Sequence, residues 1–61
     1  MEYYFKWKTF DNHGACDGVF EQIIYGKTLA RALSYFEGFH GKVGTMPDGT
    51  VLEITTIKES N

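Results

Sequence analysis

The fold is decided by residues 28–38, TLARALSYFEG, which carry a helical pattern. The apolar residues of this stretch recur at i, i+3, i+4 and i+7, so their side chains form one stripe along a helix. They are Leu29, Ala32, Leu33 and Phe36. Thr28 is the expected N-cap, because its hydroxyl can accept a hydrogen bond from a backbone N–H of the first turn. Gly38 is expected just past the helix end, with Phe39 folding back as the accompanying hydrophobic contact.

Strand patterns flank this helix on both sides. They are predicted at Tyr3–Phe10, Val19–Tyr25, Lys42–Met46 and Val51–Lys58. A loop over Asp11–Asp17 joins the first pair, and the turn Pro47-Asp48-Gly49 joins the second. We therefore expect an α+β fold of order ββαββ, with a small, mainly antiparallel sheet and one helix packed on one face. The sheet order stays open. If the second and third strands are parallel neighbours, their crossover should be right-handed.

The length and composition place the chain among small cytoplasmic proteins. Residues 1–61 make a single domain. Cys16 is the only cysteine, so an intramolecular disulfide is excluded and a reducing compartment is expected. The first residues lack the pattern of a signal peptide, and the apolar runs are far shorter than the ~20 residues of a membrane-spanning helix. We expect a soluble cytoplasmic protein without membrane contact.

Few residues are suited to catalysis or metal binding. His13 and Cys16 make half of a zinc pattern, to which His40 could add a third ligand, whereas a structural zinc site needs four. A Cys/His nucleophile needs a third group to orient the base, and the spacing supplies none. The glycines are scattered at turns and do not form a phosphate loop. We expect no enzyme activity, no cofactor and no metal.

Apolar side chains on both faces of the sheet point to binding. In the second predicted strand Val19, Ile23 and Tyr25 alternate with Phe20 and Ile24, yet one helix covers only one face of a sheet. A β-bulge could shift the phase of a strand and return its apolar residues to one core. Otherwise apolar surface remains outside the core, and such patches mark self-association or a partner site.

The first predicted strand carries the aromatic and basic residues of interest. Tyr3, Phe5 and Trp7 should share one face. Tyr4, Lys6, Lys8 and Phe10 should share the other. Aromatic side chains interleaved with cations suit single-stranded nucleic acid, which needs stacking platforms and phosphate contacts. The same lysines also suit an edge strand that is protected from aggregation. A net charge of −2 favours the second interpretation.

The segment Phe39-His40-Gly41-Lys42-Val43, followed by a Gly-bearing hairpin at Asp48-Gly49, resembles a family of small phage and mobile-element proteins. These are anti-CRISPR inhibitors of the type I-F surveillance complex. The resemblance implies a stoichiometric inhibitor that docks on the Cas backbone subunits and prevents target DNA from binding. That family is basic, whereas this chain is acidic, which argues against direct contact with DNA.

The sequence thus predicts a non-catalytic, protein-binding inhibitor of phage or mobile-element type, acting in the cytoplasm of a bacterial host. The alternatives are a small nucleic-acid-binding domain that uses the same sheet face, and a homodimer whose sheets pair face to face or edge to edge. The expected partner-binding residues are Tyr4, Lys6, Trp7, Lys8 and Phe10 on the first strand, and Lys27, Arg31 and Tyr35 at the helix.

Overall fold

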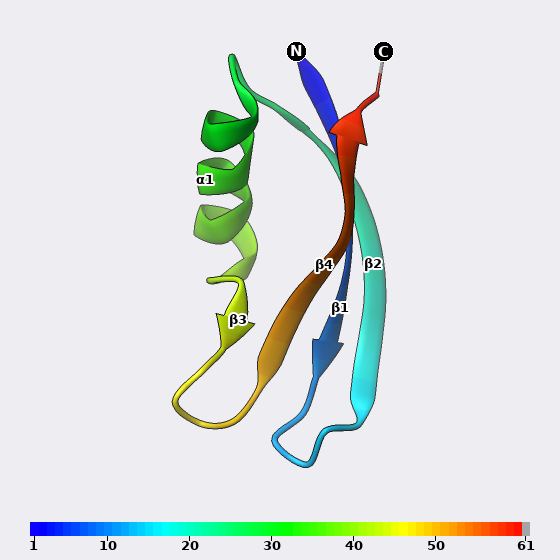
Figure 1. Ribbon diagram of the computed structural model, residues 1–61, viewed down its shortest axis with the longest axis vertical. Coiled ribbons are helices and arrows are strands. Elements are labelled where there is room, and N and C mark those ends of the chain that lie inside the picture. Colours follow the sequence, from blue (N-terminus) through cyan, green and yellow to red (C-terminus); the bar gives the residue numbers. More distant parts are fainter. Residues whose placement is uncertain (61) are drawn as a thin grey trace.

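The chain folds into five elements in the predicted order, as a computed structural model of residues 1–60 shows (Figure 1). The elements are β1 (Glu2–Phe10), β2 (Cys16–Tyr25), α1 (Leu29–His40), β3 (Gly44–Thr45) and β4 (Val51–Glu59). The four strands form one antiparallel sheet, and α1 lies on one face of it. The predicted ββαββ fold is therefore confirmed.

The sheet order is β2-β1-β4-β3. The first and last long strands pair in the middle, so each hairpin contributes one inner and one outer strand. β2 and β3 consequently lie at opposite edges, and the parallel pairing considered for them does not occur. This order puts β1, with its three core aromatic residues, at the centre of the helix-covered face.

The first hairpin is longer than its sequence suggests. β2 begins at Cys16 and not at Val19, because the loop closes within Asp11–Ala15. The side chain of Asp11 accepts hydrogen bonds from the backbone N–H groups of His13 (2.8 Å) and Ala15 (3.0 Å), which mimics a backbone turn. The third strand is much shorter than predicted and spans only Gly44–Thr45.

The helix ends two residues beyond the predicted Gly38. Thr28 is the N-cap, as expected, and its Oγ1 accepts from the backbone N–H of Arg31 at 3.2 Å. At the other end Gly41 is the cap, with a φ of 109° and a 2.9 Å hydrogen bond from its N–H to the Glu37 carbonyl. The prediction of a helix end at Gly38 is wrong. Phe39 does not fold back against the helix either, since its side chain is 67% exposed.

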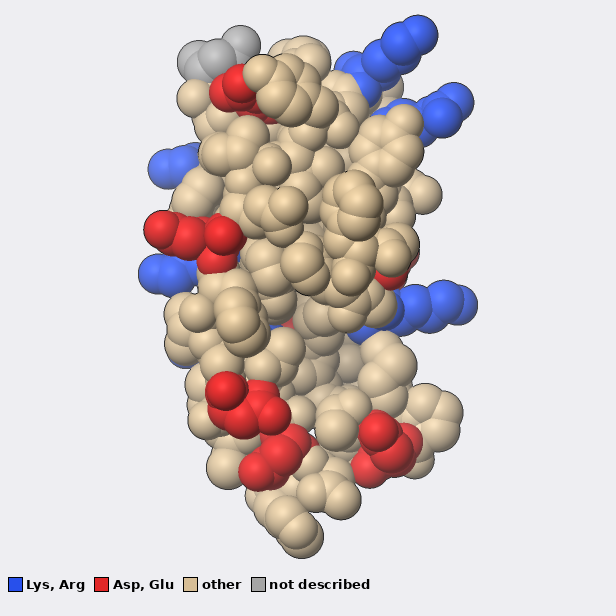
Figure 2. Space-filling view, turned by 180° about the vertical axis from the view of Figure 1, so that it is seen from behind, with Lys and Arg blue, Asp and Glu red and all other residues tan. Residues whose placement is uncertain are grey.

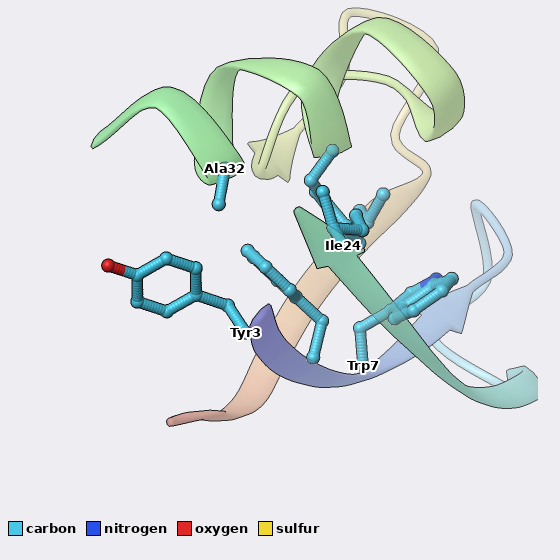
Figure 3. Packing of buried hydrophobic residues seen from close by; sticks show 7 residues of the cluster. Tyr3, Trp7, Ile24 and Ala32 are labelled. Atoms are coloured by element: carbon cyan, nitrogen blue, oxygen red, sulfur yellow. The ribbon is translucent and has the colours of Figure 1, made fainter. Parts of the chain in front are cut away.

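The core between α1 and the sheet is built around aromatic rings (Figure 3). It contains Tyr3, Phe5, Trp7, Ile24, Ala32, Phe36 and Leu52. Phe36 stacks on Phe5 at 5.0 Å between ring centroids and meets Trp7 edge-on at 4.8 Å. The predicted face of Tyr3, Phe5 and Trp7 is thus the face that the helix covers.

A β-bulge sets the phase of β4. Trp7 lies opposite Ile54, but the preceding residue of β1, Lys6, lies opposite Thr56, so Thr55 has no partner on β1. The extra residue returns Ile57 to the helix side, opposite Phe5, where it packs against the core. The bulge alternative is therefore correct for β4. It does not apply to β2, whose register with β1 is regular from Gly18 to Tyr25.

Within residues 1–60, no helix combines the length and the apolar character that crossing a membrane requires.

Candidate protein-binding surface

The face of the sheet that points away from α1, here the outer face, is left uncovered by the described part of the chain (Figure 1). Residues directly opposite each other in an antiparallel ladder share a face, so the register identifies its members. Its central rows, read across β2, β1 and β4, are Ile23–Tyr4–Lys58, Glu21–Lys6–Thr56 and Val19–Lys8–Glu53. Phe10 and Val51 extend the same face at the end of β1. The structure therefore brings four predicted residues together: Tyr4, Lys6, Lys8 and Phe10.

Two tyrosines fasten β1 to β2 through carboxylates on this face. The hydroxyl of Tyr4 donates to Glu21 Oε2 at 2.6 Å, and the hydroxyl of Tyr25 donates to Glu2. Each hydrogen bond to a carboxylate raises the pKa of the tyrosine above its ordinary value of 10.0. The Lys58 ammonium also lies 5.4 Å from the centre of the Tyr4 ring, within the range of a cation–π contact.

The lysines of β1 do not form a basic stripe. Lys6 faces Glu21 on β2, and Lys8 faces Glu53 on β4. Opposite charges at facing positions stabilise the ladder modestly and cancel in the far field. Phosphate binding draws its strength from uncompensated cations that release counterions, and each of these two lysines faces a carboxylate instead.

The most exposed apolar side chains of the outer face belong to β2. Tyr25 is 67% exposed, Val19 56% and Ile23 44%. Their shared face follows from strand alternation, but they were not among the predicted binding residues. The strand alternation alone does not show that β2 lies at the sheet edge, where side chains are least covered. We call Tyr4, Phe10, Val19, Ile23 and Tyr25 the outer-face patch.

A groove of about 330 Å³ runs between β2 and α1, on the side opposite the view of Figure 1. It is lined by Gln22, Ile23, Ile24, Tyr25, Tyr35 and Phe39, none of which carries a charge. Figure 2 shows this side as a broad uncharged area with acidic and basic side chains toward its margins. The groove and the outer-face patch share Ile23 and Tyr25, so the apolar surface wraps around the β2 edge.

The predicted helix residues also come together. Lys27, Arg31 and Tyr35 line one hollow of about 280 Å³ near the start of α1. Tyr35 contributes to the groove beside β2 as well. These residues therefore border the edge of β2 and are not part of the outer face.

The structure contradicts the predicted role of Trp7. This residue was predicted among the partner-binding residues, but the structure places it in the core with 4% of its side chain exposed. Its indole contacts Phe36 and His40, with ring centroids 4.8 and 4.6 Å away. Side chains alternate along β1, so Trp7 points to one face of the sheet while Lys6 and Lys8 point to the other. The helix covers the face of Trp7.

The three residues considered for metal binding occupy different environments. His13 and Cys16 are exposed at the first hairpin, whereas His40 ends α1, with its ring against Trp7 and its Nε2 2.7 Å from Gln22 Oε1. Among residues 1–60, no group of three or more His, Cys, Asp or Glu side chains is placed to hold a metal ion.

Comparison of the chain with family models, with curated proteins and with solved structures finds no match.

Proposed function

We propose that this protein acts by binding another protein through the outer-face patch, without catalysis. The observation that carries the proposal is the exposure of Val19, Ile23 and Tyr25 on a sheet face that no described element covers. Val19, Ile23 and Tyr25 follow the β2 edge of this face, beside the charged Lys6 and Lys8 of its central rows. Exposed apolar groups beside charged ones are typical of protein interfaces. Tyrosine is also among the residues enriched at the energetic centres of interfaces.

The more specific proposal is an inhibitor of phage or mobile-element type. The resemblance of residues 39–43 to the type I-F anti-CRISPR family suggests a CRISPR surveillance complex as the target. In this proposal the protein docks on the Cas backbone subunits and blocks target DNA. Lys6 and Lys8 each face a carboxylate, which supports contact with protein subunits in preference to DNA.

An affinity experiment tests both levels of the proposal. The tagged protein is used to capture partners from a bacterial lysate that contains a CRISPR surveillance complex, with and without nuclease. We expect a stoichiometric protein band that survives nuclease. If the band disappears with nuclease, or if nucleic acid alone is recovered, the nucleic-acid-binding alternative is supported. Capture of a different protein would retain protein binding and refute the CRISPR target.

Serine substitutions of exposed aliphatic residues test whether the outer-face patch is the binding surface. The double substitution Val19→Ser with Ile23→Ser should weaken partner binding by about tenfold or more, because two exposed anchors are removed. Val43→Ser is the control, since Val43 is 42% exposed in the loop after α1, outside the patch. Equal loss of binding in both variants would contradict the assignment of the patch.

A stability measurement tests whether the outer face is surface or core. Tyr4→Ser with Phe10→Ser should lower partner binding, because both side chains lie on the uncovered face. A loss of several kcal/mol in the free energy of unfolding, with binding intact, would show that these residues act as core and would remove them from the site.

A further inference from the structure

The two edges of the sheet are protected very differently. β3 exposes an edge of only two residues, whereas β2 exposes one of ten. Natural sheets protect their edges with short strands, prolines, lysines or bulges, because an unpaired edge is a template for another strand. Between Gly18 and Tyr25, β2 has no proline, no lysine and no break in its register with β1, and its one charged side chain, Glu21, accepts a hydrogen bond from Tyr4 of β1. This part of the edge is open to strand pairing.

Aromatic side chains border the open edge. Phe20 and Tyr25 of β2 are 46% and 67% exposed, and Tyr35 and Phe39 of α1 are 46% and 67% exposed across the groove. With about 200 Å² per aromatic side chain, the four expose roughly 450 Å². A stable interface buries about 800 Å² on each partner, so these rings supply more than half before strand backbone is counted.

The charges at the two ends of this edge are opposite. Asp17 lies at the beginning of β2, where it is the extra residue of a bulge opposite β1 and its Oδ1 accepts a hydrogen bond from Thr9 Oγ1. Lys27 follows the end of β2, where Gly26 still donates a hydrogen bond to the Met1 carbonyl of the neighbouring strand. When β2 pairs antiparallel with itself around Gln22, Asp17 of each copy comes beside Lys27 of the other. The same register sets Val19 opposite Tyr25 and Phe20 opposite Ile24. It also sets Glu21 opposite Ile23. The edge is therefore complementary to itself in charge at its ends and in apolar contacts at the Val19–Tyr25 and Phe20–Ile24 pairs.

We propose that this edge binds a second copy of the chain: β2 pairs with β2 of the partner around a two-fold axis at Gln22, which gives a dimer with one continuous eight-stranded sheet. Neighbouring registers are less favourable. A pairing centred on Glu21 sets two carboxylates opposite each other, and a pairing centred on Ile23 separates Asp17 from Lys27. In the Gln22 register both helices lie on one side, and the outer faces of the two copies form one surface.

This inference goes beyond the proposed function, and its tests need no partner protein. Sedimentation of the wild-type protein should show a monomer–dimer equilibrium that favours dimer at about 100 μM, a concentration that fills a micromolar interface. Lys27→Asp alone should weaken the dimer by at least about tenfold, because both interchain charge pairs are lost. Adding Asp17→Lys to that variant reverses both pairs and should restore much of the affinity.

Cysteine cross-linking tests the register. The native thiol is first removed by Cys16→Ser. In that background Gln22→Cys should form a disulfide-linked dimer under mild oxidation, because residue 22 lies opposite itself in the proposed pair. Val19→Cys is the control. The two copies of residue 19 are offset by six strand positions, or about 20 Å, which is too far for a disulfide.

A wild-type protein that remains monomeric at about 100 μM, with no cross-link at residue 22, overturns the proposal and leaves the edge for a strand of a different protein. Preferential cross-linking of Ile23→Cys would overturn the register. Circular dichroism of each variant shows that a negative result is not caused by unfolding. Loss of the dimer with partner capture intact would separate this inference from the proposed function.

Discussion

At the scale of single residues, two glycines near the end of α1 have opposite roles. Gly38 lies inside the helix, has no positive φ, and a Cβ added there meets no atom within 4 Å. Gly41 caps the helix with a φ of 109°, which L side chains rarely adopt. Gly38→Ala should therefore raise the free energy of unfolding by about 0.5–1 kcal/mol, whereas Gly41→Ala should lower it by about 1 kcal/mol or more. Chemical denaturation of the two variants measures both effects.

A destabilised Gly38→Ala protein would contradict the helix end seen here. The sequence predicted that end at Gly38 because glycine followed by an aromatic residue is a common termination pattern. Tertiary packing overrides it: the His40 ring lies 4.6 Å from Trp7 and 5.0 Å from Phe36, measured between ring centroids. The contact with Trp7 joins the helix end to a strand more than thirty residues away in the sequence, so it is not visible in the local pattern.

At the scale of elements, the bulge in β4 determines which side chains reach the core. Deleting Thr55 should preserve the fold, because Ile54, Thr56 and Ile57 keep their partners on β1 when the extra residue is removed. The expected cost is about 0.5–1.5 kcal/mol, that of the 3.1 Å hydrogen bond from Thr55 Oγ1 to the Lys6 carbonyl. Circular dichroism and denaturant unfolding check this expectation.

Deleting Lys6 from the facing strand is the control for this prediction. Every residue of β1 from Tyr3 to Phe10 is paired with β4, so β1 has no extra residue to lose. Deleting Lys6 therefore turns Phe5 to the opposite face, and the fold should be lost. Equal tolerance of both deletions would show that β4 does not depend on the bulge. The sequence raised a bulge as one explanation for apolar residues on both faces, but it could not place one in β4, because Thr55 and Thr56 are ordinary strand residues.

The β1–β2 ladder should weaken in alkali. The pKa values of Tyr4 and Tyr25 are raised because their hydroxyls donate to Glu21 and Glu2. Their hydrogen bonds therefore contribute stability below pH 10.0, and this contribution is lost as the pH rises through the higher folded-state pKa values. The free energy of unfolding should fall with pH in that range. The double variant Tyr4→Phe with Tyr25→Phe should show a shallower decrease, and an unchanged slope would refute the linkage.

At the scale of the whole molecule, the fold is one helix on one small sheet, and its extents are 36 × 18 × 13 Å. The element order could be derived from the sequence because each strand and the helix carry their own periodicity. The sheet order could not, because it depends on β1 pairing with β4 across the forty intervening residues 11–50. The same limit explains why the edge position of β2, and with it the exposure of Val19 and Ile23, emerged only from the structure.

So small a core should depend heavily on one residue, Phe36. The free energy of unfolding of a protein is about 0.05–0.15 kcal/mol per residue, so a chain of 61 residues has a total of roughly 3–9 kcal/mol. Removing a buried phenylalanine costs about 3–5 kcal/mol, and Phe36 is fully buried between Phe5, Trp7 and His40. Phe36→Ala should therefore remove a third or more of the total stability, a loss of about 3–5 kcal/mol, and Phe36→Leu should cost less.

Phe39→Ala is the matched control, because Phe39 belongs to the same helix and is 67% exposed. At dilute concentrations, where the monomer dominates, its free energy of unfolding should change by less than about 1 kcal/mol. At high concentration Phe39→Ala should weaken the proposed dimer, because its ring borders the β2 groove. Thermal unfolding at two concentrations separates these effects: a core residue shifts the midpoint equally at both, whereas an interface residue shifts it only at the higher one. A loss of less than about 1 kcal/mol in the Phe36→Ala protein would mean that residues outside the Phe36 cluster carry the stability of this fold.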